Sequence, residues 1–339
     1  MQARRRTGPI VLLARSWQGT GGMQRLNKDL AGQCAGAYKE RFSCIHPEGK
    51  GSVRFFLQAL SASIRTGFRK GHVHLSDLSL LPLGVLARMC GAHVTATACG
   101  LDVTYRPAWH QWMIRLCIKR MHTIVCISNA TRDEVVKRGA VSDQVVVIPC
   151  GVHSAPVRQK TVGERPVLIT VGRLVERKGV AWFIENVMPL LSGAHYIVIG
   201  SGPEEQAIRE IVARKGLRHA VEIVTHADER MRDAYLAQAD VFVMPNIPVA
   251  GDTEGFGIVC IEASSRGVPV AASHIEGLQD AVIDGQTGRF FSPNNAQECV
   301  SVISALLSHP FDVQAIAHTT QKHFGWDTVF ALYRTHVFD

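Results

Sequence analysis

The sequence predicts an α/β fold of two Rossmann-like, doubly wound domains. Short β-branched apolar runs alternate with amphipathic stretches along all 339 residues, which is the order expected when helices cover both faces of a parallel sheet. Most of the apolar runs do not alternate in polarity, and this is typical of strands buried on both faces. The length fits two domains of about 150–170 residues better than one.

Ten apolar runs have the length and composition of buried parallel strands. The stretches 204–215 and 231–239 lie between such runs and are expected to be amphipathic helices. The expected strands cover residues 10–14, 72–75, 94–97, 123–127, 145–148, 167–171, 196–200, 221–224, 241–244 and 268–271.

The alternation pauses between Pro149 and Pro156, and polar residues follow as far as Pro166. A stretch without periodicity that is bounded by prolines is typical of an interdomain linker. We therefore expect an N-terminal domain over 1–155 and a C-terminal domain over 156–322, both Rossmann-like and facing each other across a cleft. Residues 323–339 are expected to form a closing helix, with packing against the N-terminal domain as one arrangement.

The charge is divided unevenly between the two halves. The chain has a net charge of +8, but residues 1–155 hold 21 Lys+Arg and 8 Asp+Glu, whereas residues 156–339 hold 16 and 21. A basic domain indicates an anionic partner. Nucleic acid is not expected, since no aromatic-interleaved basic motif or zinc module occurs. The stretch 53–70 is either an amphipathic segment for an anionic membrane or a core helix with a solvated basic face.

The expected location is the cytoplasm, with peripheral contact to the inner face of the membrane as a second possibility. The apolar stretch 78–87 stops at Arg88, well short of the roughly 20 residues that a membrane span needs. Nine cysteines without a CxxC spacing fit free thiols in a reducing compartment.

Three glycine-containing motifs follow expected strands. Gly21 and Gly22 could open a helix whose N-terminal amides bind an anion, or could simply make a tight turn. Arg173 and Lys178 lie in the run from Gly172 to Gly179, where they could grip a diphosphate or form a solvated basic turn. Gly202, in Gly200-Ser201-Gly202-Pro203, could wrap a nucleotide or only turn the chain.

The most informative motif lies after the strand at 241–244. Glu254 closes a polar loop, Gly255 and Gly257 permit close backbone approach, and Glu262 lies eight residues after Glu254, about two helical turns away. Carboxylates at this separation can reach the hydroxyls of a sugar and of a ribose on one ligand. Glu262 has apolar neighbours, so a surface position is disfavoured. No Asp-x-Asp occurs, so no metal-binding carboxylate pair is expected.

In these motifs the chain resembles the retaining glycosyltransferases of GT-B fold, family four, also described as group one. The resemblance covers most of the chain and is strongest over residues 166–290. It depends on Gly21-Gly22, the Gly172-to-Gly179 run, Gly200-Ser201-Gly202-Pro203, Glu254-x7-Glu262, Gly267-Val268-Pro269 and Asp284-to-Gly288.

The resemblance implies transfer of a hexose from a UDP-, GDP- or dTDP-sugar to a glycan or glycolipid acceptor, with retention and without a metal or other cofactor. It assigns the donor phosphates to Arg173 and Lys178, approached by Gly21 and Gly22. Glu254 and the backbone amides of Gly255, Phe256, Gly257 and Ile258 would bind the transferred sugar. Glu262 would bind the ribose hydroxyls. Gly202 would also contact the donor. The resemblance further implies that the domain over 156–322 binds the nucleotide-sugar donor and that the domain over 1–155 binds the acceptor.

Two positions depart from the family pattern. Cys99 and Asp102 are acceptor-side candidates, but Cys99 stands where the family usually has histidine, and a thiol does not reproduce imidazole hydrogen bonding. Pro149-Cys150-Gly151-Val152-His153 replaces the usual Pro-Asn-Gly-Val-Asp. Two alternatives therefore stay open, a non-catalytic GT-B partner subunit and a sugar-nucleotide epimerase.

Overall fold

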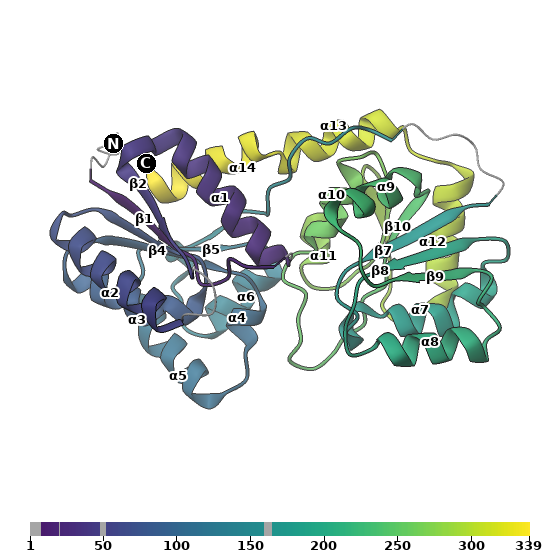
Figure 1. Ribbon diagram of the computed structural model, residues 1–339, viewed down its shortest axis with the longest axis horizontal. Helices are drawn as coiled ribbons and strands as arrows, with labels where there is room; N and C mark the ends of the chain where they lie inside the picture. Colours follow the sequence, from purple (N-terminus) through teal and green to yellow (C-terminus); the bar gives the residue numbers. More distant parts are fainter. Residues whose placement is uncertain (1–7, 20, 48–51, 159–164) are drawn as a thin grey trace. The chain divides into compact units, whose positions relative to one another are not determined.

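The computed structural model describes residues 8–19, 21–47, 52–158 and 165–339. The chain divides into two compact units, one formed by Met1–Gly151 with Trp326–Asp339 and the other by Val152–Gly325 (Figure 1). The boundary after Gly151 lies within the proline-bounded stretch and precedes the expected boundary at 155. The last fourteen residues belong to the first unit, starting three residues later than the expected closing helix. Residues 159–164 of the expected linker lie outside the described residues.

The first unit contains a six-stranded parallel sheet in the order β2-β1-β3-β4-β5-β6. Its strands are β1 (Ile10–Leu13), β2 (Phe42–Ile45), β3 (His72–Leu75), β4 (His93–Ala98), β5 (Thr123–Cys126) and β6 (Val145–Val147). Its α-helices are α1 (Gly22–Tyr38), α2 (Ser52–Phe68), α3 (Leu81–Met89), α4 (Leu101–Thr104), α5 (Ala108–Cys117), α6 (Asn129–Lys137) and α14 (Trp326–Tyr333). Short helical turns are η1 (Lys39–Arg41), η2 (Leu78–Leu80), η3 (Ile118–Arg120), η4 (Ser142–Gln144) and η7 (Arg334–Phe338).

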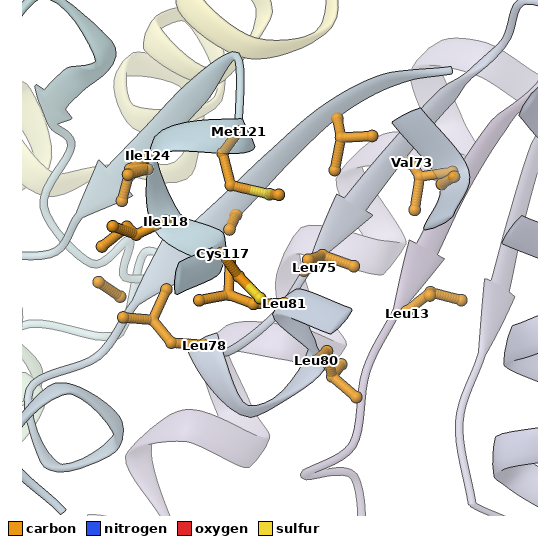
Figure 2. Close-up of a cluster of buried hydrophobic side chains, with 14 of the residues drawn as sticks. Leu13, Val73, Leu75, Leu78, Leu80, Leu81, Cys117, Ile118, Met121 and Ile124 are labelled. Carbon is orange, nitrogen blue, oxygen red and sulfur yellow. The ribbon is translucent and has the colours of Figure 1, made fainter. Parts of the chain in front are cut away.

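Successive residues of β1 are buried on opposite faces of the sheet. Leu13 belongs to the main core, which α2, α3 and α5 cover, whereas Leu12 belongs to a smaller cluster with Ala31 of α1. Figure 2 shows this main core, where Leu75 of β3 lies among side chains of η2, α3 and α5. Burial on both faces explains the near-continuous apolar strands of the sequence.

The C-terminal segment covers the second face of the same sheet. The buried rings of Tyr333 and Phe338 lie against His74 of β3, with centroids 6.2 and 5.5 Å from its imidazole. His74 contacts Thr95 through Nδ1 at 2.7 Å and Thr97 through Nε2 at 3.0 Å. His72 of the same strand also contacts Thr95, through Nε2 at 2.8 Å, so both histidines of β3 are hydrogen-bonded core residues.

The second unit contains another six-stranded parallel sheet, in the order β12-β11-β10-β7-β8-β9. Its strands are β7 (Val167–Val171), β8 (His195–Ile199), β9 (Val221–Val224), β10 (Val241–Met244), β11 (Val270–Ser273) and β12 (Gly288–Phe291). Its α-helices are α7 (Val180–Asn186), α8 (Glu205–Arg214), α9 (Glu229–Gln238), α10 (Ile258–Ser264), α11 (Leu278–Ala281), α12 (Ala296–Ser308) and α13 (Val313–Phe324), with short turns η5 (Glu176–Lys178) and η6 (Met188–Leu190).

The ten expected strands are all present, most within one residue at each end; the strand expected at 268–271 lies at Val270–Ser273. Two strands, β2 and β12, were not expected. Each forms an edge of its sheet, and each includes an exposed polar residue, Ser43 or Arg289. In both strands this exposed polar residue interrupts the continuous apolar run that is typical of a strand buried on both faces.

Among the described residues, no single helix has the length and apolar composition to cross a membrane. The consecutive helices α12 and α13 meet those criteria only when taken together, and they are bent by 114° at their junction. Cys299, Ile303 and Leu306 of α12 are buried in the core of the second unit.

Replacing Tyr333 by alanine should destabilise the first unit by about 3–5 kcal/mol, because it removes a fully buried ring from the sheet face. The matched change His336→Ala, at an exposed position, should cost less than about 0.5 kcal/mol. Urea unfolding followed by tryptophan fluorescence tests this, since four of the five tryptophans belong to the first unit. Equal losses in the two variants would contradict the packing described.

Candidate active site

The strand order of the second unit indicates where a ligand binds. β7, the first strand of this sheet, lies between β8 and β10, so the strand order reverses between β7 and β10. In open α/β sheets, ligands bind at the carboxyl ends of the strands beside such a reversal. The loop after β7 carries Arg173 and Lys178, and the loop after β10 carries Glu254.

A close backbone approach joins these two loops. Gly179 has a left-handed conformation with φ of 64°, and a Cβ there would collide with the carbonyl oxygen of Pro245. The backbone N–H of Ile247 donates to the carbonyl oxygen of Arg177 at 3.0 Å. Glycine is therefore required at position 179 for the loop after β7 to pack against the loop after β10.

The carboxylate of Glu254 lies buried at the meeting point of the loops. Its Oε2 accepts hydrogen bonds from Lys178 Nζ at 2.5 Å, from Asn246 Nδ2 at 3.0 Å and from Arg177 Nη1. Arg177 also donates from Nε to Asp252 Oδ1 at 2.8 Å. One buried oxygen thus receives three donors, two of them on cationic side chains.

Charge and burial act in opposite directions on this carboxylate. Burial alone would raise the pKa of Glu254, but the positive charges of Lys178 and Arg177 and the hydrogen bonds from Lys178 and Asn246 lower it to about 2. Burial lowers the pKa of Lys178, and Glu254 opposes that shift. Glu254 is therefore ionised at neutral pH. Its three side-chain donors all bind Oε2, so Oε1 can accept hydrogen bonds from a ligand.

The backbone of Glu254 is held from a third loop, which follows β11. Its N–H donates to Glu276 Oε2 at 2.5 Å, and its carbonyl oxygen accepts from the N–H of Gly277 at 3.2 Å. A Cβ at Gly277 would collide with the carbonyl oxygen of Gly255. The segment leading to α10 is thus fixed on both sides.

The remaining residues of the motif follow directly on α10. Gly257 precedes the helix with φ of 87°, and a Cβ there would meet Leu278. Phe256 is buried with its ring 6.0 Å from that of Phe324, and Ile258 is the first helical residue. Glu262 is only 5% exposed, as its apolar neighbours predict.

The structure separates the two cations that the sequence groups together. Lys178 is buried against Glu254, whereas Arg173 is exposed, and the described part of the chain offers its guanidinium no ion pair. Both cations lie close to Gly172. Arg173 is the next residue in the sequence, and a Cβ at Gly172 would lie 3.6 Å from Lys178 Cε. Gly202 packs against the same loop, because Leu174 N–H donates to the carbonyl oxygen of Ser201 at 2.9 Å.

The candidates in the first unit lie at strand ends as well. Gly21 precedes and Gly22 begins α1, which follows β1. Cys99 follows β4; its thiol is buried and donates to the carbonyl oxygen of Ser76 at 3.7 Å. Burial and the nearby Asp102 raise the pKa of this thiol well above its usual range.

Asp102 holds two loops of the first unit together. Its Oδ1 accepts from the N–H of Cys99 at 2.8 Å, and its Oδ2 accepts from the N–H of Leu78 at 3.0 Å. Burial and the neighbouring Asp77 raise the pKa of Asp102 to about 7, against the effect of these two hydrogen bonds. These contacts join the loops after β3 and β4.

Sequence reasoning missed four contributors to the Glu254 cluster: Arg177, Asn246, Asp252 and Glu276. Arg177 lies in the run from Gly172 to Gly179, and Asn246 and Asp252 lie in the polar loop that Glu254 closes. Glu276 is distant in sequence, and only the register of β11 brings it to Glu254. No group of three or more His, Cys, Asp or Glu side chains suited to a metal occurs in the described ranges.

The two six-stranded parallel sheets with their covering helices define a GT-B fold. Alr3699/HepE of Anabaena, solved in complex with UDP, superposes with a TM-score of 0.79 at 17% identity, over 96% of this chain and 98% of that one. The family models for glycosyl transferases group 1 and for glycosyltransferase family 4 match residues 165–309 and 20–155. The chain belongs to the group 1 glycosyltransferases.

Curated relatives agree with this assignment. A GDP-mannose-dependent alpha-(1-6)-phosphatidylinositol monomannoside mannosyltransferase of Mycolicibacterium smegmatis is 28% identical over 272 residues, which are 73% of this chain and 70% of that protein. A glycogen synthase of Mycobacterium tuberculosis is 28% identical over 308 residues, 83% of this chain and 72% of that protein.

The contrast between Arg177 and Arg173 gives a stability prediction. Arg177→Ala should destabilise the second unit by about 3 kcal/mol, because it removes one of the two cations that compensate the buried Glu254 and also removes the ion-pair partner of Asp252, while Lys178 and Asn246 remain. Arg173→Ala should change stability by less than about 0.5 kcal/mol. Urea denaturation followed by circular dichroism measures both, and a larger loss for Arg173→Ala would contradict the arrangement.

Glu254 also makes stability depend on pH. Its folded-state pKa of about 2 lies below its ordinary value of 4.5, so its contribution is complete above about pH 4.5 and disappears as the pH falls towards 2. The difference in unfolding free energy between the wild type and Glu254→Gln should therefore shrink between pH 5 and pH 3. A difference that stays constant or widens in acid would show that the carboxylate is not held by cations.

Proposed function

We propose that the chain is a retaining, metal-independent glycosyltransferase that moves a hexose from a nucleotide-diphospho-sugar to an acceptor hydroxyl. The observation that carries this proposal is the buried, ionised Glu254 beside Lys178, at the carboxyl ends of β7 and β10. A cation and a carboxylate at this point of the sheet suit the two ends of one donor, a diphosphate and a sugar.

The proposed roles follow from charge and position. Lys178 and the exposed Arg173 bind the donor diphosphate and stabilise the negative charge that grows on it as the sugar leaves. Glu254 binds hydroxyls of the transferred sugar, together with the amides of Gly255, Phe256, Gly257 and Ile258, and Gly202 lines the same loops. Glu262 binds the ribose hydroxyls.

The reaction needs no protein nucleophile in this proposal. The bond between the anomeric carbon and the diphosphate breaks, and the acceptor hydroxyl attacks from the face that the phosphate leaves. The proton of that hydroxyl passes to the leaving phosphate oxygen. The backbone amides of Gly21 and Gly22 at the start of α1 are proposed to bind phosphate oxygens.

The acceptor side is proposed to be a membrane glycolipid or a cell-surface polysaccharide precursor, reached by peripheral contact with the cytoplasmic membrane face. The basic first unit supports this choice. So does the M. smegmatis relative, which is named a phosphatidylinositol monomannoside mannosyltransferase. Asp102 and Cys99 are proposed to shape the acceptor side by positioning the loops after β3 and β4.

A panel of UDP-, GDP- and dTDP-sugars tests the donor assignment by calorimetric binding and by release of the nucleoside diphosphate. At least one donor should bind, and Lys178→Ala and Arg173→Ala should each lower turnover by about 10²–10³-fold. Arg214→Ala, which removes an exposed arginine of α8 in the same unit, should leave turnover unchanged.

Two outcomes would contradict the proposal. If no donor binds, the result would favour a non-catalytic partner subunit. Cys99 motivates this alternative, because it stands where the family usually has histidine. Release of an altered free sugar nucleotide or sugar without any acceptor dependence would favour an epimerase.

A further inference from the structure

Large apolar side chains are concentrated on one side of the first unit. Fourteen such side chains are exposed among the described residues, and ten of these belong to α2, α3 and α5 or to Tyr105 just before α5. Single exposed apolar residues are ordinary, but a concentration of this kind marks an interaction surface.

Helix α5 has an aromatic outward side. Trp109, Trp112 and Leu116 follow one another at spacings of three and four residues, so they line one stripe of the helix. They are 64%, 66% and 47% exposed. The opposite stripe, which includes Met113 and Ile114, is buried in the main core of the unit.

Helix α2 repeats this arrangement. Val53, Leu57 and Leu60 form an exposed stripe, whereas Phe55 and Ala59 are buried in the same core. The first half of the stretch 53–70, which is expected to be amphipathic, therefore has apolar side chains on its solvent-facing side as well as on its core-facing side. The outer side of α2 also includes the exposed Arg54 and Arg65, so it is both apolar and basic.

The two stripes belong to one layer of helices. α3 contacts both α2 and α5, and the inner sides of all three helices pack on the same face of the sheet. Figure 1 shows these helices on one side of the sheet, with α1 and α14 on the other. The outward side of α2, α3 and α5 is called the docking face below.

The docking face is strongly basic. Residues 52–120 contain nine Lys or Arg and only two acidic residues, Asp77 and Asp102, and both carboxylates accept hydrogen bonds from backbone N–H groups. A hollow of about 380 Å³ between α3 and η3 is lined by Arg88, Lys119 and Arg120 with Val85 and Met89. Cations around an apolar hollow suit a phosphate headgroup with attached acyl chains.

We propose that the docking face binds the surface of an anionic phospholipid bilayer, with Trp109 and Trp112 inserted at the headgroup level. Indole rings prefer this depth because they are apolar with one polar N–H. The surrounding cations supply the attraction to anionic lipid. This inference rests on the proposed function for the presence of a bilayer, but docking itself requires neither donor nor acceptor.

The test is co-sedimentation of the full chain with vesicles of phosphatidylcholine, with or without phosphatidylglycerol. We expect binding only to the phosphatidylglycerol vesicles, with a blue shift of tryptophan emission. The double variant Trp109→Ala/Trp112→Ala should weaken binding at least tenfold and remove the shift. Arg115→Glu/Lys119→Glu should also weaken binding, and more strongly at low salt.

Matched controls are Leu190→Ala and Arg214→Glu, exposed positions of the second unit, which should bind like the wild type. All six changed positions are exposed, so the melting temperature should remain near that of the wild type. Unchanged binding of the tryptophan variant would overturn the proposal. So would lipid-independent self-association that the tryptophan variant abolishes, because the face would then be covered by a second copy. Donor binding is measured separately, so a failure of membrane docking can be distinguished from a failure of the proposed glycosyltransferase function.

Discussion

The candidate site depends on one buried ionic cluster, the carboxylate of Glu254 with Lys178 and Arg177. It joins the loops after β7 and β10, the two strands between which the sheet order reverses. A buried carboxylate is costly unless cations and hydrogen-bond donors compensate it, so the cluster fixes where both loops lie. Bringing these loops close together also requires the left-handed Gly179, where the loop after β7 packs against the loop after β10. The contact of Glu276 with the backbone N–H of Glu254 then holds the segment after β10 to the loop after β11.

Much of the fold could be predicted from the sequence, because parallel strands covered on both faces are continuous apolar runs. The strand over Val241–Met244 and its neighbours stand out for this reason. The edge strands β2 and β12 could not be found in this way, since Ser43 and Arg289 interrupt their apolar pattern. The destination of the C-terminal segment depends on Tyr333 and Phe338 packing on His74, a contact between residues far apart in sequence.

The site was predictable where its chemistry lies in one short segment. Lys178 in the run from Gly172 to Gly179, and Glu254 with Gly255 and Gly257, are visible as motifs. The burial of Glu262 follows from its apolar neighbours. The pairing within the cluster was not predictable, because a run such as Arg173 to Lys178 does not say which cation points inward. The structure places Arg177 and Lys178 inside and leaves Arg173 outside. This division leaves Arg173 available for a ligand and makes Arg177 a positioning residue.

The most direct measurement of the donor site is a crystal structure of the chain with a nucleoside diphosphate bound. We expect the diphosphate oxygens to contact Lys178 Nζ and the guanidinium of Arg173, with Lys178 shifting from Glu254 towards the phosphates, and the ribose to lie at Glu262. A nucleotide bound elsewhere in the chain, with Arg173 and Glu262 untouched, would contradict the assignment of this cluster as the donor site.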